Sequence, residues 1–584
     1  MFRTTGMSAP RSNPSHPSFQ RTMTFSRQDF RPYALLLLVF LCSAVAYYPS
    51  VYSGFLNWDD TFLILANPSV RVLNPEAIVN WFSTFHVNHY HPLLLATFAV
   101  EHAIFGPAPM PFHITNLFLH GLNAVLVFLL LSRFVADRVA LTLAVLLFAL
   151  HPLRVEAVAW VSARKDLLST LFILLSVIAF LRYVDLRKPG DMAWSLAAAI
   201  LASLSKAIGA VIPFLLLASL FTFPEHRRRG CYRSLVPFII LATLTAGVAA
   251  RAQYSSEPSS IDPTSSLLRS ITLPFGNLLF YAWKTIYPAG LSAVYPFPEQ
   301  GGPNLLALSL TGMLLTFVSF VLLIRVRWKP AVAFALVWVV VSLLPILQII
   351  PVGRSFAADR YTYLPAIGLS LLAGLFLGES VARREGFYKP VVRRAGIVIL
   401  AFLGTLSFIR TEVWNRSTAL WMDVLSQYPE FAEGYVYLGS ALATEDLNEE
   451  AAILAFTESI RLDGKNPYAY SNRALASLQV PSSDSAKILS DISTAVSLDP
   501  EDADLRFFLA ETHDRFGRFS EAFLETTELL DRNPSFHRAR LLRIRSALAL
   551  GDDESVQVDI AYLTHMGIEV TLEGLDGKGV QEPR

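Results

Sequence analysis

The sequence is poor in charge and in cysteine. Charged residues make up 16% of its 584 residues, whereas soluble globular chains carry about 25%. Hydrophobic residues reach 53%, and the mean hydropathy is +0.44. This composition excludes an ordinary soluble protein and indicates that lipid surrounds much of the chain. The two cysteines, Cys42 and Cys231, stand in an apolar run and a basic loop, so neither a disulfide framework nor a thiolate metal site is predicted.

Long apolar runs follow a polar N-terminus. Residues 1–32 are rich in Ser, Pro and Arg and are expected to form a disordered cytoplasmic tail. The first run lacks a small-residue cleavage site and is expected to stay as a signal-anchor. A crossing needs about 20 mostly apolar residues, so we expect about eleven spanning helices. The runs lie near residues 33–50, 113–132, 139–151, 167–183, 191–204, 207–222, 235–251, 305–325, 331–350, 362–380 and 395–410.

Basic residues give the orientation of these spans. Lys and Arg collect in cytoplasmic loops, and basic clusters follow every second span, as at Arg227–Arg229. The N-terminus of this multi-pass membrane protein is therefore expected in the cytoplasm and the C-terminal region outside. Some cations break the charge rule at the external ends of spans. Snorkelling to lipid headgroups is an equal alternative for any one of them, but together they indicate an anion-binding site there. They are Arg154, Arg164, Lys165, Lys206, Arg354 and Arg360.

The composition changes after about residue 411. Charge rises, long apolar runs end, and Pro467, Pro500 and Pro534 recur near the tetratricopeptide period of about 34 residues. We expect helical repeats over residues 411–565, with a degenerate last unit, and a flexible tail over residues 566–584. Such solenoids bind peptides or proteins on a concave face. A purely structural cap is the alternative.

The first external loop, residues 51–112, begins with adjacent carboxylates at Asp59 and Asp60. They follow Trp58 near the end of an apolar helix, where desolvation would raise a carboxyl pKa toward the range of a general base. A helix cap or a solvated turn is the plainer interpretation of such a pair. The loop is also rich in histidine, including His91. The histidine spacing matches no compact metal-ligand set and favours the polar lining of a substrate pocket.

The segment of residues 152–166 is expected to lie as an amphipathic helix on the membrane surface. Val155, Val158 and Ala159 recur in it at helical spacing. Arg164 and Lys165 would then stand at its end, beside the next span.

Several motifs together resemble one family. They are Asn57-Trp58-Asp59-Asp60, His91-Pro92, Thr115-Asn116-Leu117-Phe118-Leu119-His120, His151-Pro152 with Glu156, Trp160 and Arg164-Lys165-Asp166, Leu204-Ser205-Lys206, and Asp359-Arg360-Tyr361-Thr362-Tyr363-Leu364-Pro365. With the order of spans and repeats, they resemble the transmembrane-and-tetratricopeptide O-mannosyltransferases and their bacterial relatives over nearly the whole chain. The bacterial relatives imply a place in a bacterial inner membrane. The resemblance implies an all-α fold, a GT-C-type bundle over residues 33–410 followed by a repeat solenoid. It also implies a polyprenyl-phosphate sugar as donor and an acidic residue in the first external loop.

The resemblance further implies an inverting transfer of a sugar, expected to be mannose, to a protein hydroxyl. Asp59 is the expected base that deprotonates the acceptor, with Asp60 supporting substrate hydroxyls, or the reverse. Cations are expected to stabilise the phosphate leaving group, and the candidates are Arg164, Lys165, Lys206 and Arg360. The expected pocket residues are Trp58, His91, Arg154, Glu156, Tyr361 and Tyr363. Interfacial belt positions are an equal alternative for the two tyrosines.

The expected partners are the lipid donor, membrane lipids and a protein acceptor recruited by the repeats, with no nucleic acid. No metal site or definite cofactor is predicted, and a divalent cation is left open. One alternative is a GT-C enzyme that glycosylates a lipid or an envelope glycan. Another is a non-catalytic scaffold or transporter for polysaccharide export. A transporter should show duplicated halves with broken helices, and the sequence shows no such duplication.

Overall fold

Helices account for nearly all of the described chain. The computed structural model describes residues 31–222, 231–254, 267–297, 304–324, 329–347, 355–383, 388–481 and 483–568. Within these ranges the only sheet pairs two short antiparallel strands, β1 (Tyr295–Pro296) and β2 (Ser355–Ala357). The all-α prediction is therefore confirmed. The expected tails, the basic loop at Arg227–Arg229 and Arg354 lie wholly or largely outside the described residues.

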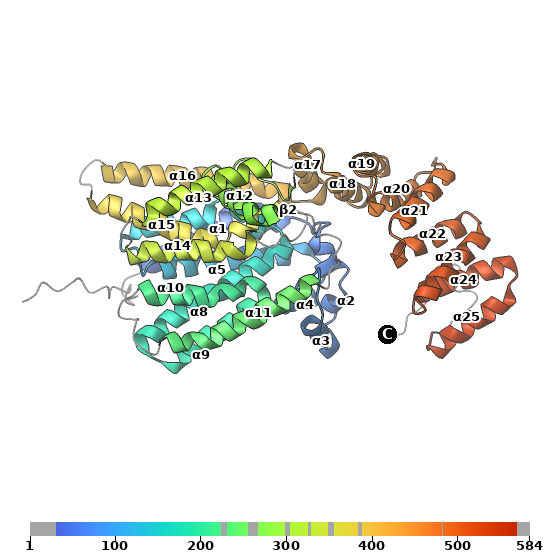
Figure 1. The fold of residues 1–584 in the computed structure, drawn as a ribbon, viewed down its shortest axis with the longest axis horizontal. Helices are drawn as coiled ribbons and strands as arrows, with labels where there is room; N and C mark the ends of the chain where they lie inside the picture. Colours follow the sequence, from blue (N-terminus) through green and yellow to red (C-terminus); the bar gives the residue numbers. More distant parts are fainter. Residues whose placement is uncertain are drawn as a thin grey trace, which may run out of the picture.

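Long apolar helices form a bundle that makes up the larger part of the molecule (Figure 1). They are α1 (Arg31–Ala46), α5 (Pro109–Leu131), α6 (Arg138–Leu150), α8 (Arg164–Leu186), α9 (Pro189–Ser205), α10 (Ile212–Thr222), α11 (Val236–Tyr254), α12 (Leu267–Ile286), α13 (Leu305–Ile324), α14 (Pro330–Leu343), α15 (Pro365–Arg383) and α16 (Tyr388–Thr411). Small residues allow close packing between them. A Cβ atom at Gly121 of α5 would lie 2.6 Å from the ring of Phe40 in α1, so a larger residue would require this ring to shift.

Four described helices are long and apolar enough to cross a bilayer: Pro109–Leu131, Val161–Leu186, Tyr232–Gln253 and Pro390–Trp414. A fifth crossing results if α6 and the residues that follow it, bent by 53°, form one span. Six further apolar helices are shorter. The count of about eleven spans therefore stays a prediction.

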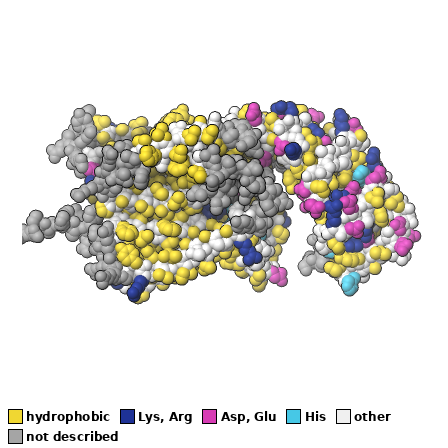
Figure 2. All heavy atoms as spheres, in the orientation of Figure 1, with side chains coloured by type: hydrophobic (Ala, Val, Ile, Leu, Met, Phe, Trp, Pro, Cys, Tyr) yellow, Lys and Arg dark blue, Asp and Glu magenta, His cyan; other side chains and the backbone are white. Residues whose placement is uncertain are grey.

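Hydrophobic side chains are the main coloured side chains on the described part of the visible bundle face, while charged side chains gather over the C-terminal part (Figure 2). On α13, for example, Leu314 and Phe317 are both more than half exposed. An apolar surface of this extent is costly in water and is normal against lipid. The bundle is thus the membrane domain of a membrane protein.

Short helices lie at the end of the bundle between α1 and α5. They are η1 (Tyr48–Tyr52), η2 (Thr61–Leu65), α2 (Pro68–Arg71), α3 (Pro75–Ser83) and α4 (Pro92–Phe105). Local sequence explains two of their starts. The side chains of Asn67 and Asn74 accept hydrogen bonds from Ser69 N and Ala77 N, and a proline follows each asparagine. An asparagine cap followed by proline at the first helical position is a standard helix start.

The prediction of a surface amphipathic helix over residues 152–166 is wrong. The segment folds as η3 (Pro152–Arg154), α7 (Val155–Ala159) and η4 (Val161–Ala163), and every one of its residues is buried. Its polar side chains find partners inside the protein rather than in water. Arg154 bonds Thr362, and Glu156 bonds Arg360. Polar groups that are satisfied internally remove the need for a solvated face.

The C-terminal part is a curved stack of helix pairs (Figure 1). After η12 (Glu412–Trp414) and α17 (Ser417–Gln427) come the pairs α18 (Ala432–Thr444) with α19 (Glu449–Leu462), α20 (Pro467–Ser477) with α21 (Ser485–Leu498), α22 (Ala503–Arg515) with α23 (Phe519–Arg532), and α24 (His537–Leu550) with α25 (Asp553–His565). The first helices begin at Ala432, Pro467, Ala503 and His537, which are 34 to 36 residues apart. The prediction of tetratricopeptide-like repeats is confirmed, including the last unit.

The remaining short turns connect the bundle helices. They are η5 (Ala207–Val211), η7 (Tyr232–Leu235), η10 (Leu344–Ile346) and η11 (Asp359–Thr362). Two of them, η5 and η11, bring charged residues to one place, because Lys206 directly precedes η5 and Arg360 lies within η11.

Candidate active site

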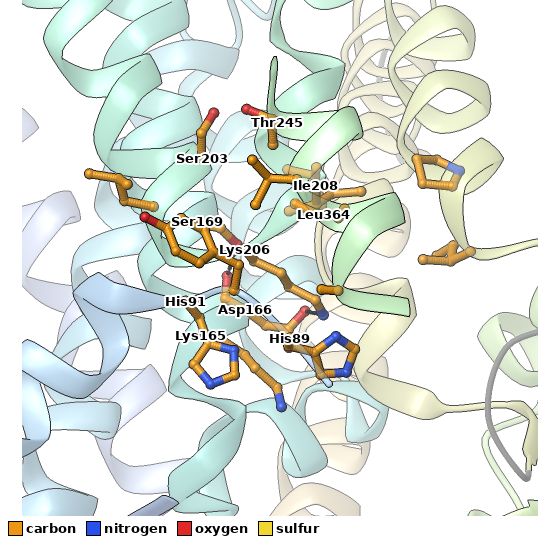
Figure 3. Close-up of a pocket in the computed structure, with 18 of the residues that line it drawn as sticks. His89, His91, Lys165, Asp166, Ser169, Ser203, Lys206, Ile208, Thr245 and Leu364 are labelled. Carbon is orange, nitrogen blue, oxygen red and sulfur yellow. Dashed lines mark hydrogen bonds and ion pairs between the residues drawn. The ribbon is translucent and has the colours of Figure 1, made fainter. Parts of the chain in front are cut away.

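A cavity of about 550 Å³ lies between α8, α9, α11 and the loop that follows α1. Figure 3 shows Lys165, Asp166, Lys206, His89 and His91 gathered near one another. The charged and aromatic residues of the wall include Trp58, Asp59, His89, His91, Trp160, Lys165, Asp166, Lys206, Arg360 and Tyr361. The apolar part is formed by residues of α9, η5 and α11, among them Ile200, Leu204, Ile208, Leu241, Leu244 and Val248. The cavity is therefore amphiphilic, with a charged region and a hydrophobic arm.

Asp59 faces the cavity and is paired with a lysine. Lys165 Nζ donates to Asp59 Oδ2 at 3.1 Å, and Asp59 lines the cavity together with Lys165. Burial raises the pKa of Asp59, but the nearby charges of Lys165 and Arg360 outweigh burial and hold this pKa below its ordinary value. The carboxylate is thus ionised at neutral pH, as an acceptor of protons has to be. The expected rise of a carboxyl pKa toward the range of a general base does not occur at Asp59.

A second ion pair forms the opposite part of the charged wall. Lys206 Nζ donates to Asp166 Oδ1 at 2.6 Å and lies 5.4 Å from the centre of the Tyr361 ring. The other carboxylate oxygen, Asp166 Oδ2, is buried and has no hydrogen-bond partner among the described residues. A buried anionic oxygen without a donor is costly. Lys206 is the cation that compensates the charge of this carboxylate.

The third cation, Arg360, is fixed by a carboxylate behind the wall. Its guanidinium pairs with Glu156, and its backbone N–H donates to Glu156 Oε2 at 2.7 Å. The guanidinium also lies 5.2 Å from the centre of the Trp160 ring. Two bonds and a ring face hold Arg360 in one orientation, which is the rigidity that a binding cation needs.

Asp60 has a different environment from its neighbour. It is fully buried and does not line the cavity. Its carboxylate accepts hydrogen bonds from Leu56 N and Ser162 N, each at 3.0 Å, and from the hydroxyl of Ser162. Asp60 thus joins the loop to η4, and burial raises its pKa to about 6.

This raised pKa predicts a pH-dependent contribution to stability. A buried acid with a raised pKa stabilises the fold at low pH and loses that contribution as pH rises through about 6; the full change is roughly 3 kcal/mol. Asp60→Asn does not titrate, so the wild type should lose thermal stability relative to this variant between about pH 4 and pH 7. Thermal unfolding of both proteins in detergent, at pH 4 and at pH 7, measures this difference in stability. A difference that does not vary with pH would contradict the assignment.

Five predicted site residues lie behind the cavity wall, and Asp60, described above, is one of them. Arg164 is fully buried and bonds Glu101 at 2.7 Å and Asn116 at 2.8 Å, so it does not reach a donor phosphate. Arg154, Glu156 and Tyr363 are likewise absent from the wall. Each has internal partners: Arg154 donates to Thr362 O at 2.6 Å, Glu156 holds Arg360, and Tyr363 Oη contacts His120 Nδ1 at 2.7 Å.

The remaining predicted residues meet at the cavity. They are Trp58, Asp59, His91, Lys165, Lys206, Arg360 and Tyr361. Two more wall residues, His89 and Asp166, were not predicted as site residues. His89 belongs to the histidine-rich loop, and Asp166 directly follows Lys165, so both signals are in the sequence. Within the described residues no group of three or more His, Cys, Asp and Glu side chains is arranged to hold a metal.

The fold and the site define an all-helical membrane protein with an amphiphilic cavity and a repeat solenoid. No protein-family model matches the chain. Curated relatives are protein O-mannosyl-transferases, in agreement with the resemblance found in the sequence. Tmtc1 of Drosophila melanogaster is 24% identical over 70% of this chain and 60% of that protein. TMTC3 of Homo sapiens is 25% identical over 73% of this chain and 51% of that protein. The chain thus spans roughly half to three fifths of their lengths.

Two solved structures show partial likenesses. The bacterial protein ArnT from Cupriavidus metallidurans, bound to undecaprenyl phosphate, is 15% identical over 81% of each chain, with a TM-score of 0.36. The MamA protein is 18% identical over 26% of this chain and 87% of its own, with a TM-score of 0.24. At these TM-scores neither structure defines the fold of this chain.

Proposed function

We propose that the protein is an integral-membrane glycosyltransferase of the GT-C class. It transfers mannose from a polyprenyl phosphate to a hydroxyl of a protein acceptor. The observation that carries this proposal is the amphiphilic cavity, in which an ionised carboxylate and three cations lie beside a hydrophobic arm. A lipid-phosphate sugar has the same division between a charged head and an apolar chain. The mannose and the protein acceptor come from the names of the curated relatives.

The hydrophobic arm suits a prenyl chain. Leu241, Leu244 and Val248 line it from α11. In the apolar helical segment Tyr232–Gln253, which includes most of α11, only 22% of the most apolar stretch is buried inside the protein. The arm therefore borders the lipid phase, from which a prenyl chain can enter sideways. Burying each CH₂ group there contributes about 0.8 kcal/mol.

The three cations suit the phosphate of the donor. Lys165, Lys206 and Arg360 all line the charged region, and each already has a carboxylate partner. A lysine has three N–H donors and an arginine has five, so each retains donors for phosphate oxygens. As the sugar–phosphate bond breaks, negative charge grows on the phosphate. Preorganised cations stabilise that charge in the transition state.

Asp59 is the proposed catalytic base. The acceptor hydroxyl oxygen attacks the anomeric carbon while Asp59 takes the hydroxyl proton. The bond between the anomeric carbon and the phosphate oxygen breaks, and its electron pair leaves with the polyprenyl phosphate. A single displacement of this kind inverts the anomeric centre.

The proposal includes the setting of the reaction. The N-terminus is cytoplasmic, the cavity opens on the periplasmic side of a bacterial inner membrane, and the solenoid recruits the acceptor there. Positively charged loops on the opposite side support this orientation. The solenoid curves past the end of the bundle that carries α2 and α3 (Figure 1), so a bound protein would lie near the catalytic loop.

A transfer assay tests the proposal. The purified protein in lipid nanodiscs receives radiolabelled polyprenyl-phosphate mannose and serine- and threonine-rich peptides. We expect label in the peptide, lost on treatment that releases O-linked sugars. Label found only in a lipid or glycan added in parallel would replace the protein acceptor with an envelope acceptor. Failure to label any acceptor would contradict the enzymatic function and favour a scaffold.

A further inference from the structure

The loop that carries Asp59 is held from outside the bundle, at Asn57. The backbone N–H of Asn57 donates to Ser417 Oγ at 2.9 Å, and its side-chain Nδ2 donates to Tyr437 O at 2.8 Å. Trp421 Nε1 donates to Asn57 Oδ1 at 2.8 Å. Ser417 and Trp421 belong to α17, and Tyr437 belongs to α18. The backbone N–H and both polar atoms of the side chain are therefore engaged by the C-terminal part.

Aromatic rings follow the same route into the cavity. Trp421 stacks on Tyr437 with ring centres 4.4 Å apart, and it also meets Trp58 edge-on at 5.7 Å. Trp58 stacks on Trp160 at 4.5 Å with an angle of 11°. Both Trp58 and Trp160 line the cavity. A continuous packed path thus leads from the first repeat helix to the residue next to Asp59.

Two rings of this path are buried, while Trp58 and Tyr437 are half-buried. Trp421 is fully buried, and Trp160 is 1% exposed. Close-packed interiors transmit small shifts instead of absorbing them. A displacement of α17 or α18 would therefore move Asn57 and Trp58, and with them the carboxylate of Asp59 two residues further on.

We propose that Asn57 and Trp421 are positioning residues, through which the first helices of the C-terminal part set the place of the Asp59 carboxylate. This inference rests on the proposed function, since it concerns the orientation of the proposed base. Lys165 holds Asp59 from the bundle side, and α17 holds the preceding residues from the other side. Because α18 is also the first helix of the first repeat pair, the solenoid is structurally part of the catalytic loop's support.

The test removes one hydrogen-bond donor while keeping an aromatic ring. Trp421→Phe eliminates the N–H that holds Asn57 Oδ1, and Asn57→Ala removes the receiving side chain. We expect kcat for transfer to fall about ten-fold in each variant, because small misplacements of reacting groups are costly. The KM for the lipid donor should change less than about two-fold, since no donor-binding group is altered. Trp194→Phe is the matched control and should leave kcat unchanged. Trp194 lies near the start of α9, outside the part of the helix that lines the cavity, and is 73% exposed.

A third variant covers the case in which Trp421→Phe does not fold. Ser417→Ala removes only the hydroxyl that accepts from Asn57 N, and we expect it to lower kcat about three-fold with unchanged donor KM. An active wild type with unchanged kcat in all three variants would overturn the positioning role and leave the proposed function standing. A fall in donor affinity with constant kcat would also overturn it. A wild type inactive with every lipid donor would remove the proposed function, and this inference with it.

Discussion

Replacing Asp59 with asparagine should lower the rate of sugar transfer by about 10²–10⁴-fold, the range typical for loss of a general base. The amide has nearly the same shape as the carboxylate but cannot take a proton. Asp59 lines the cavity, whereas Asp60 is enclosed by Leu56 and Ser162. The loss should therefore appear at residue 59 in kcat, with the donor KM much less affected. Initial rates of the transfer assay measure both.

The control for this variant is Asp531→Asn, an isosteric change at an exposed site of α23 in the solenoid. It should leave the rate unchanged. Because the pKa of Asp59 lies below its ordinary value, protonation of this group should cost no activity between about pH 7 and pH 5. Full activity of Asp59→Asn would contradict its role as the base. In that case Asp166 would be the remaining carboxylate on the cavity wall.

Replacing Lys206 with methionine should lower kcat/KM by about 10²–10³-fold, as for loss of one preorganised group that stabilises transition-state charge. Lys206 lines the charged region and is held by Asp166 at 2.6 Å. Methionine keeps much of the side-chain length and removes the charge. Lys465→Met, at an exposed position between two repeats, is the matched control and should have no effect.

The double variant Lys206→Met with Asp166→Asn separates two roles of this lysine. If Lys206 serves only to neutralise Asp166, removing both charges should restore much of the activity, because no buried charge remains unpaired. If Lys206 binds the donor phosphate, the double variant should stay as inactive as the single one. We predict the second result. Restored activity would exclude Lys206 from phosphate binding.

The repeat solenoid was the most predictable part of the fold. Its period is set by prolines and by small residues that have to face a neighbouring helix. At Gly439, for instance, a Cβ atom would lie 2.6 Å from the ring of Phe456. The buried segment of residues 152–166 could not be predicted in the same way. Its apolar spacing fits a surface helix. Only the structure shows that its polar residues find partners inside the protein, at Arg360 and Thr362 of η11 and at Asp60 directly before η2.

The site was predicted in its residue types but not in the direction of each side chain. Arg164 and Lys165 stand next to each other at the start of α8, and successive helical residues point about 100° apart. Lys165 therefore lines the cavity while Arg164 pairs with Glu101. Asp59 and Asp60 divide in the same manner between wall and interior. Sequence places such neighbours on one side of the membrane, and only packing decides which of them meets the substrate.

The most direct measurement compares two mannose donors in the transfer assay, each at the same concentration. One is polyprenyl-phosphate mannose, whose chain would occupy the arm along α11, and the other is a water-soluble nucleotide-linked mannose. The amphiphilic cavity predicts transfer from the lipid donor alone, with KM rising as the prenyl chain is shortened. Equal use of the soluble donor, or a KM independent of chain length, would contradict the central claim that this cavity holds a lipid-phosphate sugar.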